Sequence, residues 1–283
     1  MVNEIEFINL KNKFLDFYEE STKVDSIQDK FNIWKEKYNF AAIPPTEEGQ
    51  KIAFNMFEKS YGKYEKCIDK IKSFEVDEEK VNRILEKVKE TLNCSESVDL
   101  SVIYFVGFFE GNAFVAPSGN KLALCLPIEN DNSELYDEMI LAHELTHIVH
   151  YKVQKSEATW LRPLSFLLLE EGLAMRVSKE VVPGMTEYQY VSSKEEWWNE
   201  CEEESSKIIE GLLPYVKEEI SEILFKFTMG AGTTNREREA YYVAWNLFDK
   251  LLEQGFSLEE LARISKEASK EFVEKQVKLL IEK

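Results

Sequence analysis

The sequence predicts an α+β fold that is mostly helical. A helical N-terminal lobe over residues 1–95 is expected to precede a domain over residues 96–283, which contains a small antiparallel sheet followed by further helices. Apolar residues recur at spacings of three and four along most of the chain, as in helices with one buried face. Residues 98–128 are instead rich in β-branched and aromatic residues in short runs. With 283 residues, 44% of them hydrophobic, the chain can bury a full core.

The N-terminal lobe is predicted from the helical spacing between Asn3 and about Cys94. Pro44 and Pro45 interrupt this spacing, because proline lacks the backbone N–H that a helix interior needs. We therefore expect about four helices with charged outer faces in this segment. The apolar positions that define them include Ile5, Leu10, Phe14, Phe17, Val81, Ile84, Leu85, Val88 and Leu92.

The predicted sheet lies within residues 98–128. The runs VDLSVIYFVGFF and KLALCLPI flank the segment GNAFVAPSGN, whose Gly, Asn, Pro and Ser residues are typical of turns. We expect short strands that pair in antiparallel fashion. Helical spacing then returns in five further segments, which are residues 135–154, 164–181, 195–227, 236–255 and 265–283.

Composition excludes several classes of partner. Lys+Arg of 35 against Asp+Glu of 53 gives 35 − 53 = −18, a charge that repels nucleic acid and anionic lipid. No basic cluster, export signal or apolar stretch long enough to span a membrane is present, so we expect no nucleic acid, no membrane and a cytoplasmic protein. The cysteines form no CxxC pair, which favours free thiols over disulfides at Cys67, Cys94, Cys125 and Cys201.

All three histidines lie in one predicted helix, and two of them form the motif His143-Glu144-Leu-Thr-His147. Positions i and i+4 share a helix face about 6 Å apart along the axis, so both imidazoles can bind one metal with Glu144 beside it. The surrounding residues are apolar, and buried polar groups need partners. These features favour a metal site over the alternative, a polar outer face of an amphipathic helix.

A catalytic zinc needs three protein ligands and one open position. No histidine remains for the third ligand, and the longer motif with histidine six residues after the second histidine is excluded by Val153. A carboxylate or a cysteine is left. Glu170 and Glu171 interrupt the apolar segment LLLEEGLAMRV, where a buried carboxylate without a partner is unfavourable. An exposed glutamate pair at the edge of the helix is the alternative.

HELTH followed by EEGLA resembles the gluzincin metallopeptidases, the superfamily of thermolysin and the zinc aminopeptidases. The resemblance implies a zincin-like metallopeptidase domain that hydrolyses peptide bonds in a peptide or protein substrate. Glu171 would be the third zinc ligand, with Glu170 as the fallback, and Glu144 would be the general base acting on zinc-bound water. The separation 171 − 147 = 24 is slightly longer than is usual for the group.

The resemblance also implies substrate-binding residues. Asn112 and Ala113, before Phe114, are similar to the thermolysin-type edge strand that pairs with a peptide backbone. The alternative is that they are turn residues leading Phe114 into the core. His150 lies about 10 Å along the helix from His143, too far to share the metal, so we expect it in the substrate pocket or supporting the site.

The stabiliser of the oxyanion, the negatively charged carbonyl oxygen that forms during hydrolysis, is less defined. Thermolysin-type enzymes use a downstream histidine, which this chain lacks, and Met175 stands where some members have an acidic residue. Zinc aminopeptidases use a tyrosine, which implies Tyr241 or Tyr242, with Tyr241 favoured. Core packing of both tyrosines, or a role for the arginines just before them, remains open.

Two other functions compete with the peptidase: a non-catalytic binding or regulatory module on the same scaffold, and a metal-free helical scaffold. The intact glutamate of the HELTH motif favours an enzyme, because a structural zinc site needs no base. The sequence leaves the substrate, endo- or exopeptidase action and the oligomeric state open.

Overall fold

The computed structural model describes residues 3–41, 46–111, 113–156, 159–192 and 194–281. Its contacts divide the chain into two compact units. We call residues 2–81 with 97–134 the sheet unit, and residues 82–96 with 135–283 the helical unit. These units do not coincide with residues 1–95 and 96–283, since the first residues of the chain pair with a strand near residue 100.

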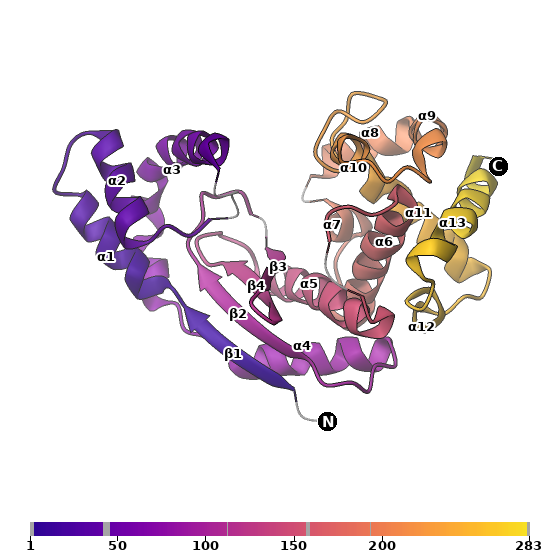
Figure 1. The fold of residues 1–283 in the computed structure, drawn as a ribbon, viewed down its shortest axis with the longest axis horizontal. Coiled ribbons are helices and arrows are strands. Elements are labelled where there is room, and N and C mark those ends of the chain that lie inside the picture. Colours follow the sequence, from indigo (N-terminus) through magenta and orange to yellow (C-terminus); the bar gives the residue numbers. More distant parts are fainter. Residues whose placement is uncertain (1–2, 42–45, 112, 157–158, 193, 282–283) are drawn as a thin grey trace. The chain divides into compact units, whose positions relative to one another are not determined.

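The sheet unit contains four strands in the order β1-β2-β4-β3. Their bounds are Glu4–Asn9 for β1, Asp99–Phe105 for β2, Phe114–Ser118 for β3 and Lys121–Pro127 for β4. β1 and β4 both run parallel to β2, and only β3 and β4 are antiparallel. The prediction of an antiparallel sheet is therefore wrong, and the sheet is mixed (Figure 1).

The first strand also corrects the prediction of helix from residue 3. In β1 the exposed Glu4 and Glu6 alternate with the half-buried Ile5 and Phe7, which is the period of a strand. β1 pairs with β2 from Glu4 opposite Asp99 to Asn9 opposite Tyr104. This alternation is visible in the sequence but short, and the pairing with a segment far along the chain stabilises the strand.

In the described residues, the sheet unit also contains the helices α1 (Lys11–Ser21), α2 (Ile27–Lys37) and α3 (Glu47–Ser73). A further helix, α4 (Glu78–Thr91), begins in the sheet unit and continues into the helical unit. Tyr38 and Tyr64 connect these helices to the loop after β2, because their hydroxyls donate to the carbonyl oxygens of Val106 at 3.1 Å and Gly107 at 2.8 Å. The predicted N-terminal helices are thus confirmed beyond residue 10.

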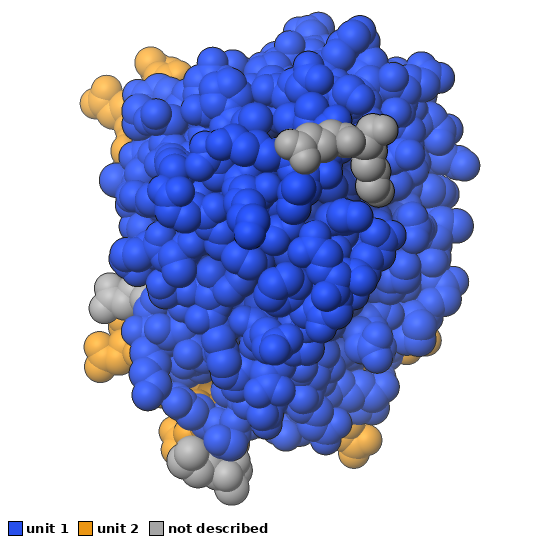
Figure 2. Space-filling view, turned by 90° about the vertical axis from the view of Figure 1, so that its right-hand side faces the viewer, with its two compact units in different colours: residues 1, 82–96, 135–283 blue, residues 2–81, 97–134 orange. Residues whose placement is uncertain are grey.

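The helical unit is built around α6 (Leu164–Val181), nearly all of whose residues are buried. α6 contacts α7, α11, α12 and α13. The side chains of this unit are closely packed on the face shown in Figure 2. The other elements are α5 (Glu134–Gln154), α7 (Glu187–Val191), α8 (Glu195–Glu203), α9 (Ser205–Leu212), η1 (Leu213–Tyr215), α10 (Ser221–Thr228), α11 (Glu239–Glu253), α12 (Leu258–Leu261) and α13 (Lys266–Ile281).

A glycine allows α6 and α11 to approach closely. A Cβ at Gly172 would lie 2.2 Å from Cδ2 of Phe248 and 2.9 Å from the carbonyl oxygen of Ala244, both on α11. One turn later, the guanidinium of Arg176 lies 3.5 Å above the ring of Trp245 and donates to its carbonyl oxygen at 2.9 Å. These contacts hold α6 against α11 on the turn that carries the candidate ligand Glu171.

The α+β, mostly helical class is confirmed. All four cysteines are free thiols, as expected. Within the described part of the chain, no helix combines the length and the apolar character needed to cross a membrane.

Candidate metal centre

Two helices of the helical unit bring three candidate ligands together. His143 and His147 share a face of α5, and their Nε2 atoms lie 3.2 Å apart. Oε2 of Glu171, on α6, lies 3.4 Å from Nε2 of His143 and 3.7 Å from Nε2 of His147. Across the described residues, this is the one group of three or more His, Cys, Asp or Glu side chains with ligand atoms within 4.8 Å of one another.

The geometry of this triad fits a metal ion. A tetrahedral zinc with bonds of about 2.0–2.1 Å needs ligand atoms about 3.3 Å apart. The side chains of His143, His147 and Glu171 are only 14%, 13% and 10% exposed, so their converging polar atoms have little water to pair with. A cation compensates three such atoms at once.

Two of the three groups in the triad, Glu171 and His147, have the protonation states that bind a metal. Burial by itself would raise the pKa of Glu171. The nearby His147 and the contact with His143 lower it by a larger amount, so that the pKa is about 2. Burial lowers the pKa of His147 to about 3, so this imidazole is neutral at physiological pH. Burial also lowers the pKa of His143, but the contact with Glu171 and the charge of Glu144 raise it above its usual value. An ionised carboxylate and a neutral imidazole are the forms that bind metals.

Glu144 lies next to the triad on α5 and is half-buried. Burial raises its pKa to about 7. The charge of His143 acts to lower this pKa, and the negative charge of Glu171 acts to raise it. A carboxylate with a pKa near 7 can accept and return a proton at neutral pH. The residue expected to be the general base thus has the acidity that this role requires.

The structure decides between the two adjacent glutamates. Glu170 is 1% exposed and forms an ion pair with Arg162, whereas Glu171 faces the histidines. Consecutive helix residues point about 100° apart, so they cannot both reach one metal. Glu171 is therefore the candidate ligand. Arg162 was not expected in this role from the sequence, although an arginine directly before Pro163 and the apolar α6 is a recognisable signal.

The two tyrosines have different surroundings. Tyr241 is half-buried, and burial with the charges of Glu171 and Glu144 raises its pKa, partly offset by Arg238. Its hydroxyl has no hydrogen-bond partner among the residues that the structure describes. Its raised pKa keeps the phenol protonated, and the hydroxyl lies within electrostatic range of Glu171 and Glu144.

Tyr242 lies elsewhere in the core. It is 1% exposed, its hydroxyl donates to Oε1 of Glu202 at 2.8 Å, and its ring packs 5.5 Å from that of Trp198. Both contacts are to α8. The structure therefore brings Tyr241, and not Tyr242, towards the triad.

Of the predicted substrate-binding residues, His150 is the one in the same unit as the triad. His150 is 2% exposed, bonds to the backbone of Ala262 and packs 5.8 Å from the ring of Phe166. Burial lowers its pKa to about 4, so it is a neutral core residue. Asn112 lies outside the described residues, and Ala113 precedes β3 in the sheet unit. A role for Asn112 and Ala113 in substrate binding stays a prediction.

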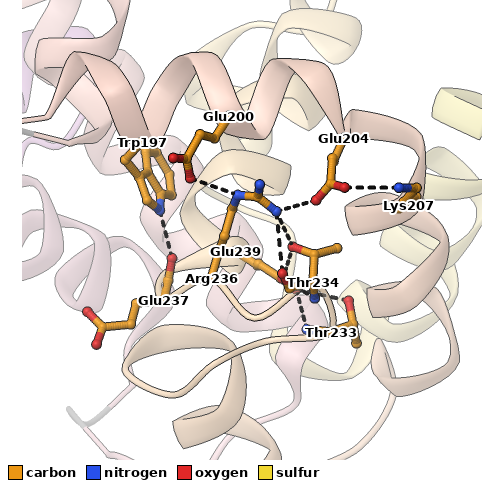
Figure 3. Close-up of polar contacts among 9 residues, drawn as sticks. All are labelled: Trp197, Glu200, Glu204, Lys207, Thr233, Thr234, Arg236, Glu237 and Glu239. Carbon is orange, nitrogen blue, oxygen red and sulfur yellow. Dashed lines mark hydrogen bonds and ion pairs between the residues drawn. The ribbon is translucent and has the colours of Figure 1, made fainter.

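The segment before α11 is held by a buried carboxylate (Figure 3). We call residues 229–238 the α11 loop. Glu239 is fully buried, and its Oε2 accepts hydrogen bonds from the backbone N–H of Thr233 at 2.8 Å and its hydroxyl at 3.0 Å. Its Oε1 accepts from the N–H and the hydroxyl of Thr234, both at 2.7 Å. This anchor was not expected from the sequence, where its only signal is an acidic residue at the start of an apolar helix.

Contacts with α8 and the residue after it hold the other side of the α11 loop. Arg236 forms ion pairs with Glu200 and Glu204. The indole N–H of Trp197 donates to the carbonyl oxygen of Glu237 at 2.9 Å. Figure 3 shows these side chains reaching the loop from the neighbouring helix. The loop that leads to Tyr241 is thus fixed from two directions.

The chain matches no family model, no curated protein and no solved structure. Its likeness to the gluzincins therefore rests on the HELTH and EEGLA segments. What the geometry establishes is a largely buried group of His143, His147 and Glu171 that can bind a metal ion.

Proposed function

We propose that this chain is a zinc-dependent peptidase of the gluzincin type. The observation that carries the proposal is the triad of His143, His147 and Glu171, whose ligand atoms lie 3.2–3.7 Å apart, with Glu144 beside it. A structural zinc site has four protein ligands, whereas three ligands with access to solvent are typical of a catalytic site.

The ligand types favour zinc over other common ions. Two imidazole nitrogens and one carboxylate suit zinc and related transition metals, whereas magnesium and calcium prefer oxygen ligands alone. The third ligand comes from a second helix, as in the gluzincins that the sequence resembles. We therefore propose zinc as the ion.

The residues divide the chemistry between them. Zinc, when bound, lowers the pKa of a water molecule and polarises the carbonyl of the scissile bond. Glu144 takes a proton from the attacking water and passes it to the leaving amine. The Tyr241 hydroxyl donates a hydrogen bond to the carbonyl oxygen as that oxygen gains negative charge. Because burial and the charge of Glu171 raise the pKa of Tyr241, the phenol keeps the proton that it must donate.

A Glu144→Gln variant tests the proposal. The amide is nearly isosteric with the carboxylate but cannot act as a base, so we expect unchanged zinc content and loss of peptide hydrolysis. Turnover within a few-fold of wild type would refute the role of Glu144. If zinc-loaded wild-type protein cleaves no member of a broad peptide library, the proposed peptidase activity is wrong, and the non-catalytic binding module becomes the better account.

A further inference from the structure

Arg238 differs from the other arginines of this chain. The sequence contains six arginines, and five of them form ion pairs with carboxylates. Arg238 forms none with any residue that the structure describes, although the chain contains 53 acidic residues against 35 basic ones. The five paired arginines are Arg83, Arg162, Arg176, Arg236 and Arg263.

The guanidinium of Arg238 lies close to the candidate catalytic tyrosine. Its Cζ is 3.8 Å from the centre of the Tyr241 ring, and its Nη2 donates to the carbonyl oxygen of Val191 at 3.4 Å. The side chain is half-buried. Its charge acts on the Tyr241 hydroxyl together with the charges of Glu171 and Glu144. Arg238 is therefore a cation near the proposed reaction site that forms no ion pair with a carboxylate of the described residues.

The backbone fixes the position of this side chain. Arg238 adopts a left-handed conformation, with φ 64° and ψ 25°, which residues other than glycine rarely adopt. The next residue is the buried anchor Glu239, and the preceding one is held by Trp197. The α11 loop thus holds the backbone on both sides of Arg238, and the Tyr241 ring supports its guanidinium.

We propose that Arg238 binds a carboxylate of the peptide substrate beside the metal triad. This inference rests on the proposed peptidase function and deepens it by naming the substrate class. A guanidinium can bind a carboxylate through two parallel hydrogen bonds, and only one weak bond to Val191 engages this one. Near the negative charges of Glu144 and Glu171, a substrate carboxylate needs such a cation. The carboxylate is either the C-terminus of the peptide or an acidic side chain.

The test compares peptides that differ by one charge. A peptide with a free C-terminus and one acidic side chain is assayed against its C-terminal amide and against the version with glutamine in place of glutamate. In wild type, neutralising the recognised carboxylate should raise KM by about tenfold to a hundredfold, the effect of losing one hydrogen-bonded ion pair. The analogue that loses affinity identifies the source of the carboxylate.

Arg238→Gly is the matching variant, because glycine adopts the left-handed conformation without strain. It should raise KM for the carboxylate peptide to the value for the neutral analogue, so that the preference for the carboxylate peptide is lost, and it should change kcat by less than about threefold. Arg238→Lys should keep part of the preference for the carboxylate peptide. Asn235→Gly is the control, since Asn235 in the same loop has φ 65° and takes no part in the site. This control should keep the wild-type preference.

Two results would overturn the inference. Arg238→Gly could retain the preference, or it could lower kcat equally for charged and neutral peptides, in which case Arg238 stabilises the oxyanion. Peptide affinity is also measured by fluorescence anisotropy in a Glu144→Gln background. If this variant binds the carboxylate peptide and loses that binding when Arg238 is also replaced, the carboxylate site is upheld. If wild-type protein at the same time hydrolyses no peptide, the peptidase proposal is refuted. Hydrolysis without any carboxylate preference would refute the site alone.

Discussion

Gly172→Ala should destabilise the protein although alanine is the better helix former. The new Cβ would lie 2.2 Å from Phe248 Cδ2 and 2.9 Å from the carbonyl oxygen of Ala244. The ring must move by more than 1 Å to reach ordinary contact, and the oxygen belongs to the backbone of α11, which cannot yield locally. Overpacking of this kind costs about 1–3 kcal/mol, against about 1 kcal/mol gained in helix propensity.

Gly62→Ala is the matched control for this prediction. Gly62 lies inside α3, is exposed, and has no atom of a neighbouring group within 4 Å of the position that a Cβ would occupy. The same substitution should therefore stabilise the protein by about 0.5–1 kcal/mol. Opposite signs are expected for the two variants in urea denaturation and in thermal melting.

The position of Gly172 also predicts a weaker metal site. Glu171 is its neighbour, so a displacement of α6 from α11 moves the carboxylate relative to His143 and His147. We expect the Gly172→Ala variant to bind zinc more weakly than wild type in a competition titration with a chelator, and Gly62→Ala to bind it normally. An increase in melting temperature for Gly172→Ala, equal to that of Gly62→Ala, would refute the proposed close contact between α6 and α11.

The remaining predictions concern single side chains. Tyr241→Phe should lower peptide turnover about a hundredfold to a thousandfold, whereas Tyr242→Phe should cost about 1 kcal/mol of stability and leave turnover near normal; the reverse pattern would contradict the assignment. Glu239→Ala leaves the buried donors of the α11 loop unpaired and should destabilise the protein by about 3 kcal/mol, and an unchanged urea midpoint would show that the carboxylate is no anchor. Burial raises the pKa of Glu129, only partly opposed by backbone N–H groups of Gly107 and Phe109. A raised folded-state pKa means that this group's stabilising contribution is present in acid and is lost as the pH rises through that pKa. Glu129→Gln should therefore be more stable than wild type at pH 7.5, with a smaller difference at pH 4.5, and a variant that is less stable at pH 7.5 would contradict the sign.

The metal triad could be predicted from the sequence only in part. The spacing of His143 and His147 places both on one helix face, so local geometry predicts their convergence. The choice between Glu170 and Glu171 depends on how α6 is rotated against its neighbours. The ion pair of Glu170 with Arg162 shows that rotation, and no spacing along the chain encodes it.

Non-local contacts explain what the sequence analysis missed. β1 forms because it pairs with β2 some ninety residues later. The direction in which β2 and β4 pair is likewise not determined by the sequence of either strand. The role proposed for Arg238 depends on a left-handed backbone and on the absence of an ion pair with a carboxylate of the described residues. Tyr241 and Tyr242 are adjacent in sequence, yet packing against α8 removes only Tyr242 from the site.

The central claim is that His143, His147 and Glu171 hold one zinc ion. Elemental analysis of the purified protein, after equilibration with zinc and removal of the excess, tests it most directly. The account predicts close to one zinc per chain in wild type and in Glu170→Gln, and a large loss in His147→Ala and Glu171→Gln, with circular dichroism showing that each variant is folded. A wild-type protein without zinc, or full zinc occupancy in folded His147→Ala and Glu171→Gln, would contradict the account.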